Sequence, residues 1–236
     1  MKNIRILSVT FSEPIAEHEI PAFRGAIIEK VGLERDLFHN HNNQSDEDQQ
    51  YHYRYPLVQY KRRRKKPTLV FIEHGIDEAQ HFFTKPSWDM TMAGRTYHTS
   101  IEQMLVREYP LGITETEQHY TIRHWQALNQ KNFSRYMELD GLPEKAQLLE
   151  KVLTAHLLAL GSGVDHFFTE RFDLIITRIL GTRYRAFGGV KVKTFDVRFK
   201  VNMQIPPFLG VGKGVSKGFG TVSKYVPKKK PVVNRF

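Results

Sequence analysis

The chain has 236 residues, of which 40% are hydrophobic and 12% aromatic, so it suits one large domain or two small ones with a real core. Its net charge of +10 favours a polyanion or an acidic surface as partner, although a basic but otherwise ordinary enzyme would show the same charge. The absence of cysteine excludes disulfides, zinc ribbons and thiol nucleophiles. No apolar run approaches the ~18 residues of a membrane span, and the N-terminus lacks the apolar centre of a signal peptide, so we expect a cytoplasmic protein.

The first half of the chain predicts the order strand, helix, strand, strand, helix, strand. The first strand covers Ile4–Phe11, and Pro21 begins the helix that follows it, since proline suits the first helical position. The remaining elements are strands at Tyr51–Lys61 and Leu69–Glu73, a short helix at Ile76–Phe83, and an extended segment around Met90–Ser100. This is the element order of the ferredoxin-like fold.

The second half repeats this pattern in part. Its elements are an extended segment at Ile113–Trp125, a long helix at Leu142–Leu160, and strands at Phe172–Leu180 and Val190–Val201. We therefore expect an α+β protein of two tandem ferredoxin-like (βαββαβ) domains. Residues 1–111 form the first, and residues 112–236 form the second, which carries a glycine-rich loop and a basic tail.

His39 and His41 support the sharpest chemical hypothesis. They flank one asparagine in a polar loop directly after the first helix, so we expect both to be exposed. Two imidazoles with pKa values near neutrality can serve as base and acid, which is the pair that RNA cleavage through its own 2′-OH needs. No metal is required for that chemistry. The alternatives are a histidine pair without function and a metal site that adds Asp46, Glu47 or Asp48.

Aromatic and basic residues interleave over residues 51–55, at the start of the second predicted strand. Tyrosines such as Tyr55 can stack RNA bases on an open sheet face, although such a stripe is also typical of a core. The basic run Lys61–Lys66 is predicted to form the tip between two strands, where it is either solvated or neutralises backbone phosphates. The candidate phosphate contacts are Arg62, Arg63 and Arg64, with Arg198 extending the positive charge into the second half.

Five glycines fall within the eleven residues 210–220, near the end of the chain. Glycine lets a backbone take φ > 0 and come close to another backbone or to a phosphate, and exposed N–H groups in such a loop form an anion site. The run does not match a Walker A loop, because Gly214 follows Lys213 where Ser or Thr is required. The candidate RNA-holding residues are Gly210, Gly212, Lys213, Lys217, Gly218 and Gly220. The alternative is that the glycines only shape a tight turn and the lysines are solvated.

The glycine spacing resembles the C-terminal signature of the repeat-associated (RAMP) RNA-binding proteins of CRISPR systems. Residues 23–30, 37–42 and 53–61 resemble the N-terminal half of the CRISPR repeat-RNA-processing endoribonucleases, the Cas six family. Residues 195–202, which lead into the glycine run, resemble the C-terminal half of that family. The resemblance spans most of the chain, in the right order.

The resemblance implies two ferredoxin-like domains and metal-independent cleavage of precursor CRISPR RNA within its repeat hairpin, with no cofactor. The products would carry a 2′,3′-cyclic phosphate and a 5′-hydroxyl. It places the catalytic histidine on His39 or His41, a supporting cation on Lys30, and an assisting hydroxyl on Tyr53 or Tyr55.

Two other functions fit part of the sequence. A RAMP subunit that binds CRISPR RNA in an effector complex without cutting it would share the glycine run and the charge. A two-histidine phosphoesterase, which needs two His-x-Ser/Thr motifs, is the other alternative, and His98-Thr-Ser100 is one such motif in the sequence. The expected partners are CRISPR repeat RNA and, in an assembly, effector-complex subunits; no membrane contact is expected, and monomer and homodimer both stay open.

Overall fold

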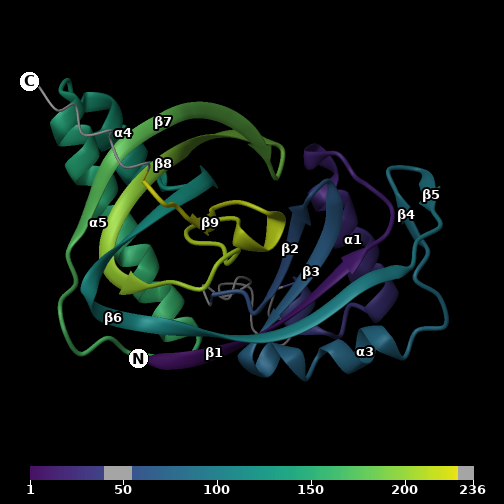
Figure 1. The fold of residues 1–236 in the computed structure, drawn as a ribbon. Coiled ribbons are helices and arrows are strands. Elements are labelled where there is room, and N and C mark those ends of the chain that lie inside the picture. Colours follow the sequence, from purple (N-terminus) through teal and green to yellow (C-terminus); the bar gives the residue numbers. More distant parts are fainter. Residues whose placement is uncertain (40–54, 228–236) are drawn as a thin grey trace, which may run out of the picture.

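In the computed structural model, which describes residues 1–39 and 55–227, a seven-stranded sheet runs through both halves of the chain (Figure 1). Its strands follow the order β2-β3-β1-β6-β8-β7, and β9 pairs with β6. All of these pairs are antiparallel. The strands are β1 (Lys2–Phe11), β2 (Val58–Arg63), β3 (Lys66–Ile72), β6 (Ile101–Trp125), β7 (Leu174–Phe187), β8 (Val190–Gln204) and β9 (Thr221–Lys224).

The first half has the ferredoxin-like topology, with β1 between β3 and β6 and with β2 at the edge. Helix α1 (Ile20–Val31) begins with Pro21 in its first turn and packs on one face of this sheet. Phe23 of α1 lies edge-on between Phe11 and Tyr60, with ring centroids 5.7 Å from each. The residues of β1 alternate between two cores, because successive side chains of a strand point to opposite faces.

The segment around Met90–Ser100 is extended, as predicted, but it is not the last strand of the first βαββαβ unit. Strands β4 (Met90–Met92) and β5 (Arg95–Tyr97) pair only with each other, in a separate two-stranded hairpin. Ala93 and Gly94 turn the hairpin with φ of 50° and 78°, the geometry that a tight hairpin turn requires. The strand that completes the first-half sheet is β6, which starts only after this hairpin.

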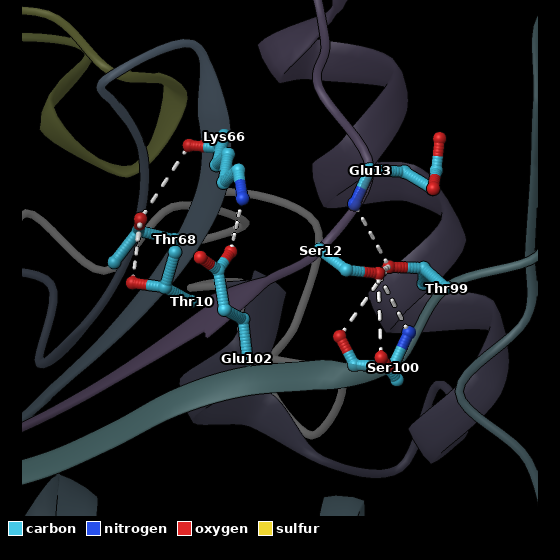
Figure 2. A network of polar contacts seen from close by, with 8 residues as sticks. All are labelled: Thr10, Ser12, Glu13, Lys66, Thr68, Thr99, Ser100 and Glu102. Atoms are coloured by element: carbon cyan, nitrogen blue, oxygen red, sulfur yellow. Dashed lines mark hydrogen bonds and ion pairs between the residues drawn. The ribbon is translucent and has the colours of Figure 1, made fainter.

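A polar network fastens the end of β1 to the start of β6 (Figure 2). The Ser12 hydroxyl lies 3.1 Å from the Thr99 hydroxyl and accepts the Ser100 N–H at 3.1 Å. The Ser12 N–H donates to the Ser100 carbonyl at 2.9 Å. These bonds continue the strand pairing across the irregularity that follows Thr10.

In the second half, β6 lies between β8 and β9, and β7 lies at the far edge. Helices α4 (Gln130–Glu138) and α5 (Leu142–Gly163) follow β6, and α5 buries residues such as Leu149, Leu153 and Leu157 in the second-half core. Helix α4 was not predicted; the Asn129 side chain caps it by accepting the Asn132 N–H at 2.8 Å.

The glycine-rich loop, residues 207–220, replaces the second helix of the second ferredoxin-like unit. It connects β8 to β9, where a βαββαβ unit would place that helix, and holds only the short 3-10 helix η3 (Val215–Lys217). The predicted fold class, two tandem ferredoxin-like units with a glycine-rich loop, is confirmed with this modification. Further short helices are α2 (Asp36–His39), α3 (Ala79–Phe83), η1 (Glu17–Glu19) and η2 (Glu73–Ile76).

Both halves share β6. Its residues up to Leu111 pair with β1, and from Gly112 onward they pair with β8. A Cβ at Gly112 would lie 2.7 Å from the Cα of Met1, so the crossover point brings two backbones together. The predicted domain boundary at residues 111 and 112 thus falls inside a continuous strand, and the division of the chain into two domains at this point stays a prediction. Within residues 1–39 and 55–227, no helix has the length and apolar character to cross a membrane.

Candidate functional site

The glycine-rich loop lies against β2, the edge strand of the first half (Figure 1). The Gly210 N–H donates to Oε1 of the fully buried Gln59 at 3.0 Å. The Tyr55 hydroxyl donates to the Gly210 carbonyl at 2.8 Å. These two bonds join segments about 150 residues apart, so the loop ties the second half of the chain to the first.

The loop glycines face the protein's own atoms. A Cβ at Gly212 would lie 2.6 Å from Nε1 of Trp125, and one at Gly220 would overlap the carbonyl oxygen of Val211. Side chains at Gly210 and Gly218 would likewise meet neighbouring side chains. Each glycine thus has a packing role against the fold itself, and direct RNA contact by the four predicted glycines stays a prediction.

The two loop lysines have different environments. Lys213 is exposed, and its backbone N–H donates to the Gln126 carbonyl at 3.2 Å. Lys217 is half-buried, with its Nζ 4.5 Å from the centroid of the Phe187 ring. Burial lowers the pKa of Lys217, and the nearby Arg24 lowers it further. Lys213 is therefore the more accessible of the two predicted phosphate contacts.

The basic run Lys61–Lys66 is not a uniform solvated tip. Strand β2 extends to Arg63 and β3 begins at Lys66, so the turn itself is only Arg64 and Lys65, both with positive φ. Lys61 lies buried under the loop. Lys66 forms an ion pair with Glu102, while its carbonyl accepts the Thr68 hydroxyl (Figure 2).

Two of the three arginines of this run, Arg62 and Arg63, also contact the protein. The Arg62 Nε donates to the Ile15 carbonyl at 2.6 Å. The Arg63 guanidinium lies over the Phe208 ring, 4.5 Å from its centroid. Arg64 is exposed in the turn. Arg198 lies elsewhere, on β8, where its guanidinium stacks 4.1 Å from the centroid of the Tyr225 ring.

A cleft of about 60 Å³, called the loop cleft below, lies between the glycine-rich loop and the face of the first-half sheet that carries Ile6 and Ser8. Its basic side chains are Lys61, Arg62, Arg63 and Arg107, and its hydroxyls are Ser8, Thr68, Tyr109 and Thr221. No Asp or Glu lines this cleft in the part of the chain that the structure describes. Such a surface suits an anion, which agrees with the net charge of the sequence.

Two residues of the loop cleft, Arg107 and Phe208, were not predicted. Arg107 is one basic residue in a long strand, and no local pattern in β6 indicates that it faces the loop. Phe208 lies just before the glycine run and is 40% exposed with φ of 67°, an uncommon backbone for a bulky residue. In the sequence, the position of Phe208 was indicated only by the neighbouring proline and glycines.

The predicted catalytic residues are only partly described. Helix α2 ends at His39, and His41 lies outside the described residues, as do Asp46 and its acidic neighbours. Lys30, in the last turn of α1, donates from Nζ to the Ser87 carbonyl at 3.0 Å. The Tyr55 hydroxyl bonds to the loop, and burial raises its pKa far above the ordinary value. Catalytic roles for all four residues stay predictions.

A second polar cluster joins the two halves near the start of α1. Glu17 Oε1 lies 2.7 Å from His124 Nδ1 and 2.8 Å from an Arg185 Nη atom. The other Nη atom of Arg185 lies 2.8 Å from His124 Nε2. Burial lowers the pKa of His124, against the opposing effect of Glu17, which indicates a neutral ring that donates to Glu17 and accepts from Arg185. No local motif links residues 17, 124 and 185, so this cluster was not predicted.

Two ferredoxin-like halves with a shared strand, and a glycine-rich loop that closes on a basic cleft, agree with the RAMP class of protein that the sequence resembles. Family models of the Cas6b N-terminal domain and the Cas6b C-terminal domain match residues 2–110 and 112–225. The chain therefore belongs to the Cas6b family, and the resemblance that the sequence indicated is confirmed.

Two solved structures share this fold, and one curated protein is similar in sequence. The structure described as Cas6b matches with a TM-score of 0.82 and 23% identity over 95% of this chain and 100% of that one. The structure of the CRISPR RNA processing endoribonuclease Cas6b has a TM-score of 0.71 and 21% identity, with the same coverage. The uncharacterized protein MJ0978 of Methanocaldococcus jannaschii is 31% identical over 142 residues, which are 57% of this chain and 90% of that protein.

Proposed function

We propose that this protein is an endoribonuclease that cleaves precursor CRISPR RNA within its repeats. The observation that carries the proposal is the match of both halves to Cas6b domains, at 2–110 and 112–225. One structure with the same fold is that of a CRISPR RNA processing endoribonuclease. The loop cleft supports an RNA partner, because it presents four basic side chains and no described carboxylate.

In the proposed reaction, the RNA supplies its own nucleophile. A base takes the proton from the 2′-OH, the 2′-oxygen attacks the adjacent phosphorus, and an acid protonates the departing 5′-oxygen. The products are a 2′,3′-cyclic phosphate and a 5′-hydroxyl. His39 and His41 are the proposed acid and base, and this chemistry uses no metal and no cofactor.

The test of this reaction is a repeat RNA with a single 2′-deoxy nucleotide at the cleavage site. In the presence of a chelator, we expect the protein to cut the all-ribose repeat and to leave the deoxy repeat intact, because the nucleophile is missing. The affinity for the two RNAs should be the same within about twofold, since one hydroxyl contributes little to phosphate contacts. Cutting of the deoxy repeat at the normal rate would rule out this chemistry, and tight binding without cutting of either RNA would favour a non-catalytic RAMP subunit.

The loop lysines give a second expected outcome. Replacing both lysines (Lys213→Ala with Lys217→Ala) should weaken RNA binding and make the plot of log K against log [salt] shallower, by about 0.7 per lost contact on single-stranded RNA. Because Lys213 is exposed and Lys217 is half-buried, the single variant Lys213→Ala should account for most of the change in slope.

The control is Lys151→Ala, which removes one exposed lysine from α5 and leaves the loop intact. The measurement is equilibrium RNA binding at several salt concentrations, with the fold checked by circular dichroism. An unchanged affinity and slope in the folded double variant would exclude the loop lysines as phosphate contacts. The remaining candidates would then be the run Lys61–Lys66 and the second-half arginines, such as Arg198.

A further inference from the structure

Lys61 is the only buried lysine in the described part of the chain. It lies in β2 with 5% of its surface exposed, opposite Thr68 of β3. Its Nζ has no hydrogen-bond partner among the described residues. A Cβ built on Gly210 would lie 2.8 Å from that Nζ, so the loop backbone covers the amine directly. An isolated buried charge is costly unless an opposite charge compensates it, so the buried amine favours an anionic ligand.

The loop cleft determines which anion fits. Lys61 is one of its lining residues, together with three arginines and four hydroxyl groups, and no carboxylate from the described residues competes for the amine. The volume of about 60 Å³ suits a group of phosphate size and is too small for a folded helix or a duplex. Arg107 lines the cleft from β6, which β3 and β1 separate from β2 in the sheet.

An aromatic ring lies at the edge of the same cleft. Phe208 is 40% exposed, although it takes a strained left-handed backbone conformation (φ 67°) that is uncommon for a bulky residue. Its N–H donates to the Val222 carbonyl at 2.8 Å, which holds the strained backbone in place. The guanidinium of Arg63 covers one face of the ring. Exposed rings beside basic grooves are stacking platforms for the bases of single-stranded nucleic acids.

We propose that the loop cleft binds one nucleotide of single-stranded RNA, with its phosphate on Lys61 and its base stacked on Phe208. Arg63 and Arg107 lie beside the phosphate and add charge-assisted hydrogen bonds. The nucleotide is single-stranded because a base within a duplex is already stacked and cannot turn onto the ring. The proposal rests on the proposed function for its choice of RNA as the ligand, and it assigns no catalytic role to Lys61.

The amine has a further property that the binding experiment can use. Burial lowers the pKa of Lys61 to about 7, so in the free protein the ammonium form is lost as the pH rises through that value. The other charged or titratable groups that line the cleft are Arg62, Arg63, Arg107 and Tyr109; β1, β3, β9 and the loop add none. Because a phosphate binds the charged form, affinity should be highest below pH 7 and fall as the pH rises above it.

The decisive experiment compares Lys61→Met with Lys65→Met. Both variants remove one lysine from the same hairpin, but Lys65 is exposed in the turn and does not line the cleft. The probes are a short oligouridylate and the repeat RNA with a 2′-deoxy cleavage site, and the readout is equilibrium binding at pH 6.5 and pH 8.5. We expect Lys61→Met to bind both RNAs about tenfold more weakly at pH 6.5 and to lose part of the pH dependence. Lys65→Met should change affinity less than threefold.

Stability distinguishes this binding role from a structural one. Replacing a buried, unpaired charge with an apolar side chain of similar volume should leave the urea midpoint unchanged or raise it. A lower midpoint for Lys61→Met would indicate a structural role and overturn the proposal. Equal losses of affinity in Lys61→Met and Lys65→Met would also overturn it, because they would indicate only a general effect of charge.

Phe208→Ala tests the stacked base. With 2-aminopurine in the oligonucleotide, stacking on the ring quenches the fluorescence, so the quenching should disappear in Phe208→Ala while Lys65→Met keeps it. Unchanged quenching would exclude Phe208 as the platform. Failure of the proposed function gives a different result, since a protein that never cuts the repeat could still bind oligouridylate in a Lys61-dependent way. Normal cutting with unchanged binding in Lys61→Met would overturn only the nucleotide site.

Discussion

His39→Ala and His41→Ala should each slow cleavage of the repeat RNA by about 10² or more, because each removes one proton transfer from the reaction. The double variant should be little slower than the poorer single variant, since groups that act as a unit are not additive. The backbone before this pair is well anchored. Phe38 is fully buried, its ring lies 5.8 Å from that of Phe71, and its carbonyl accepts the Tyr60 hydroxyl at 2.9 Å.

The measurement is single-turnover cleavage with the protein in excess, paired with binding of the 2′-deoxy repeat. Binding should change little in either variant. His81→Ala is the matched control, because this histidine lies in α3 and was never a candidate for the reaction. If both single variants cut at the wild-type rate, the active site lies elsewhere. His18 and His124, which line a second cavity of about 200 Å³ between the halves, would then be tested next.

Gly220→Ala should destabilise the protein by about 2–5 kcal/mol. A left-handed backbone costs an alanine roughly 1–2 kcal/mol, and φ at this position is 64°. The added methyl group would also overlap the Val211 carbonyl oxygen, and overpacking of this kind typically costs about 1–3 kcal/mol. The Gly220 carbonyl accepts the Val211 N–H at 2.8 Å, so relief of the overlap would break the turn that closes the loop.

Gly188→Ala separates the two contributions. Its φ of 55° is close to that of Gly220, but a Cβ there would have no heavy atom within 4 Å. We therefore expect a loss of only about 1–2 kcal/mol in urea unfolding. Equal losses in the two variants would show that backbone conformation alone matters at Gly220. The loop would then not be held by its close contact with Val211.

The two clearest predictions from sequence, α1 and α5, depend on patterns that lie within a few turns of chain. Pro21 in the first turn and apolar residues at helical spacing are enough to predict α1 without knowing where the sheet lies. The prediction of the sheet failed where one sequence pattern was compatible with two strand pairings. Met90–Ser100 is extended, as predicted, but the turn at Ala93 and Gly94 makes it a separate hairpin. An extended segment does not indicate which strand it will pair with.

The basic run shows the same limit at the level of the site. Its composition predicted a charged hairpin, and β2 and β3 do form one. The separation of a buried Lys61 from an exposed Arg64 depends on which face of β2 the glycine-rich loop covers. The bond from Gly210 to Gln59 spans 151 residues, so no window of sequence around the run contains that information.

The class of the protein could be recognised from the sequence through its resemblance to the RAMP proteins, because the glycine spacing and the short motifs that carry the resemblance are local properties of the chain. The sequence also determined that the glycines would permit close approach, since that follows from the missing Cβ. What the glycines approach depends on the folded chain: they lie against Trp125, Val211 and the covered amine of Lys61. The same holds for Glu17, His124 and Arg185, which meet because β6 passes through both halves. Burial and pairing between residues so far apart in the sequence depend on the tertiary fold, so local sequence patterns do not predict them.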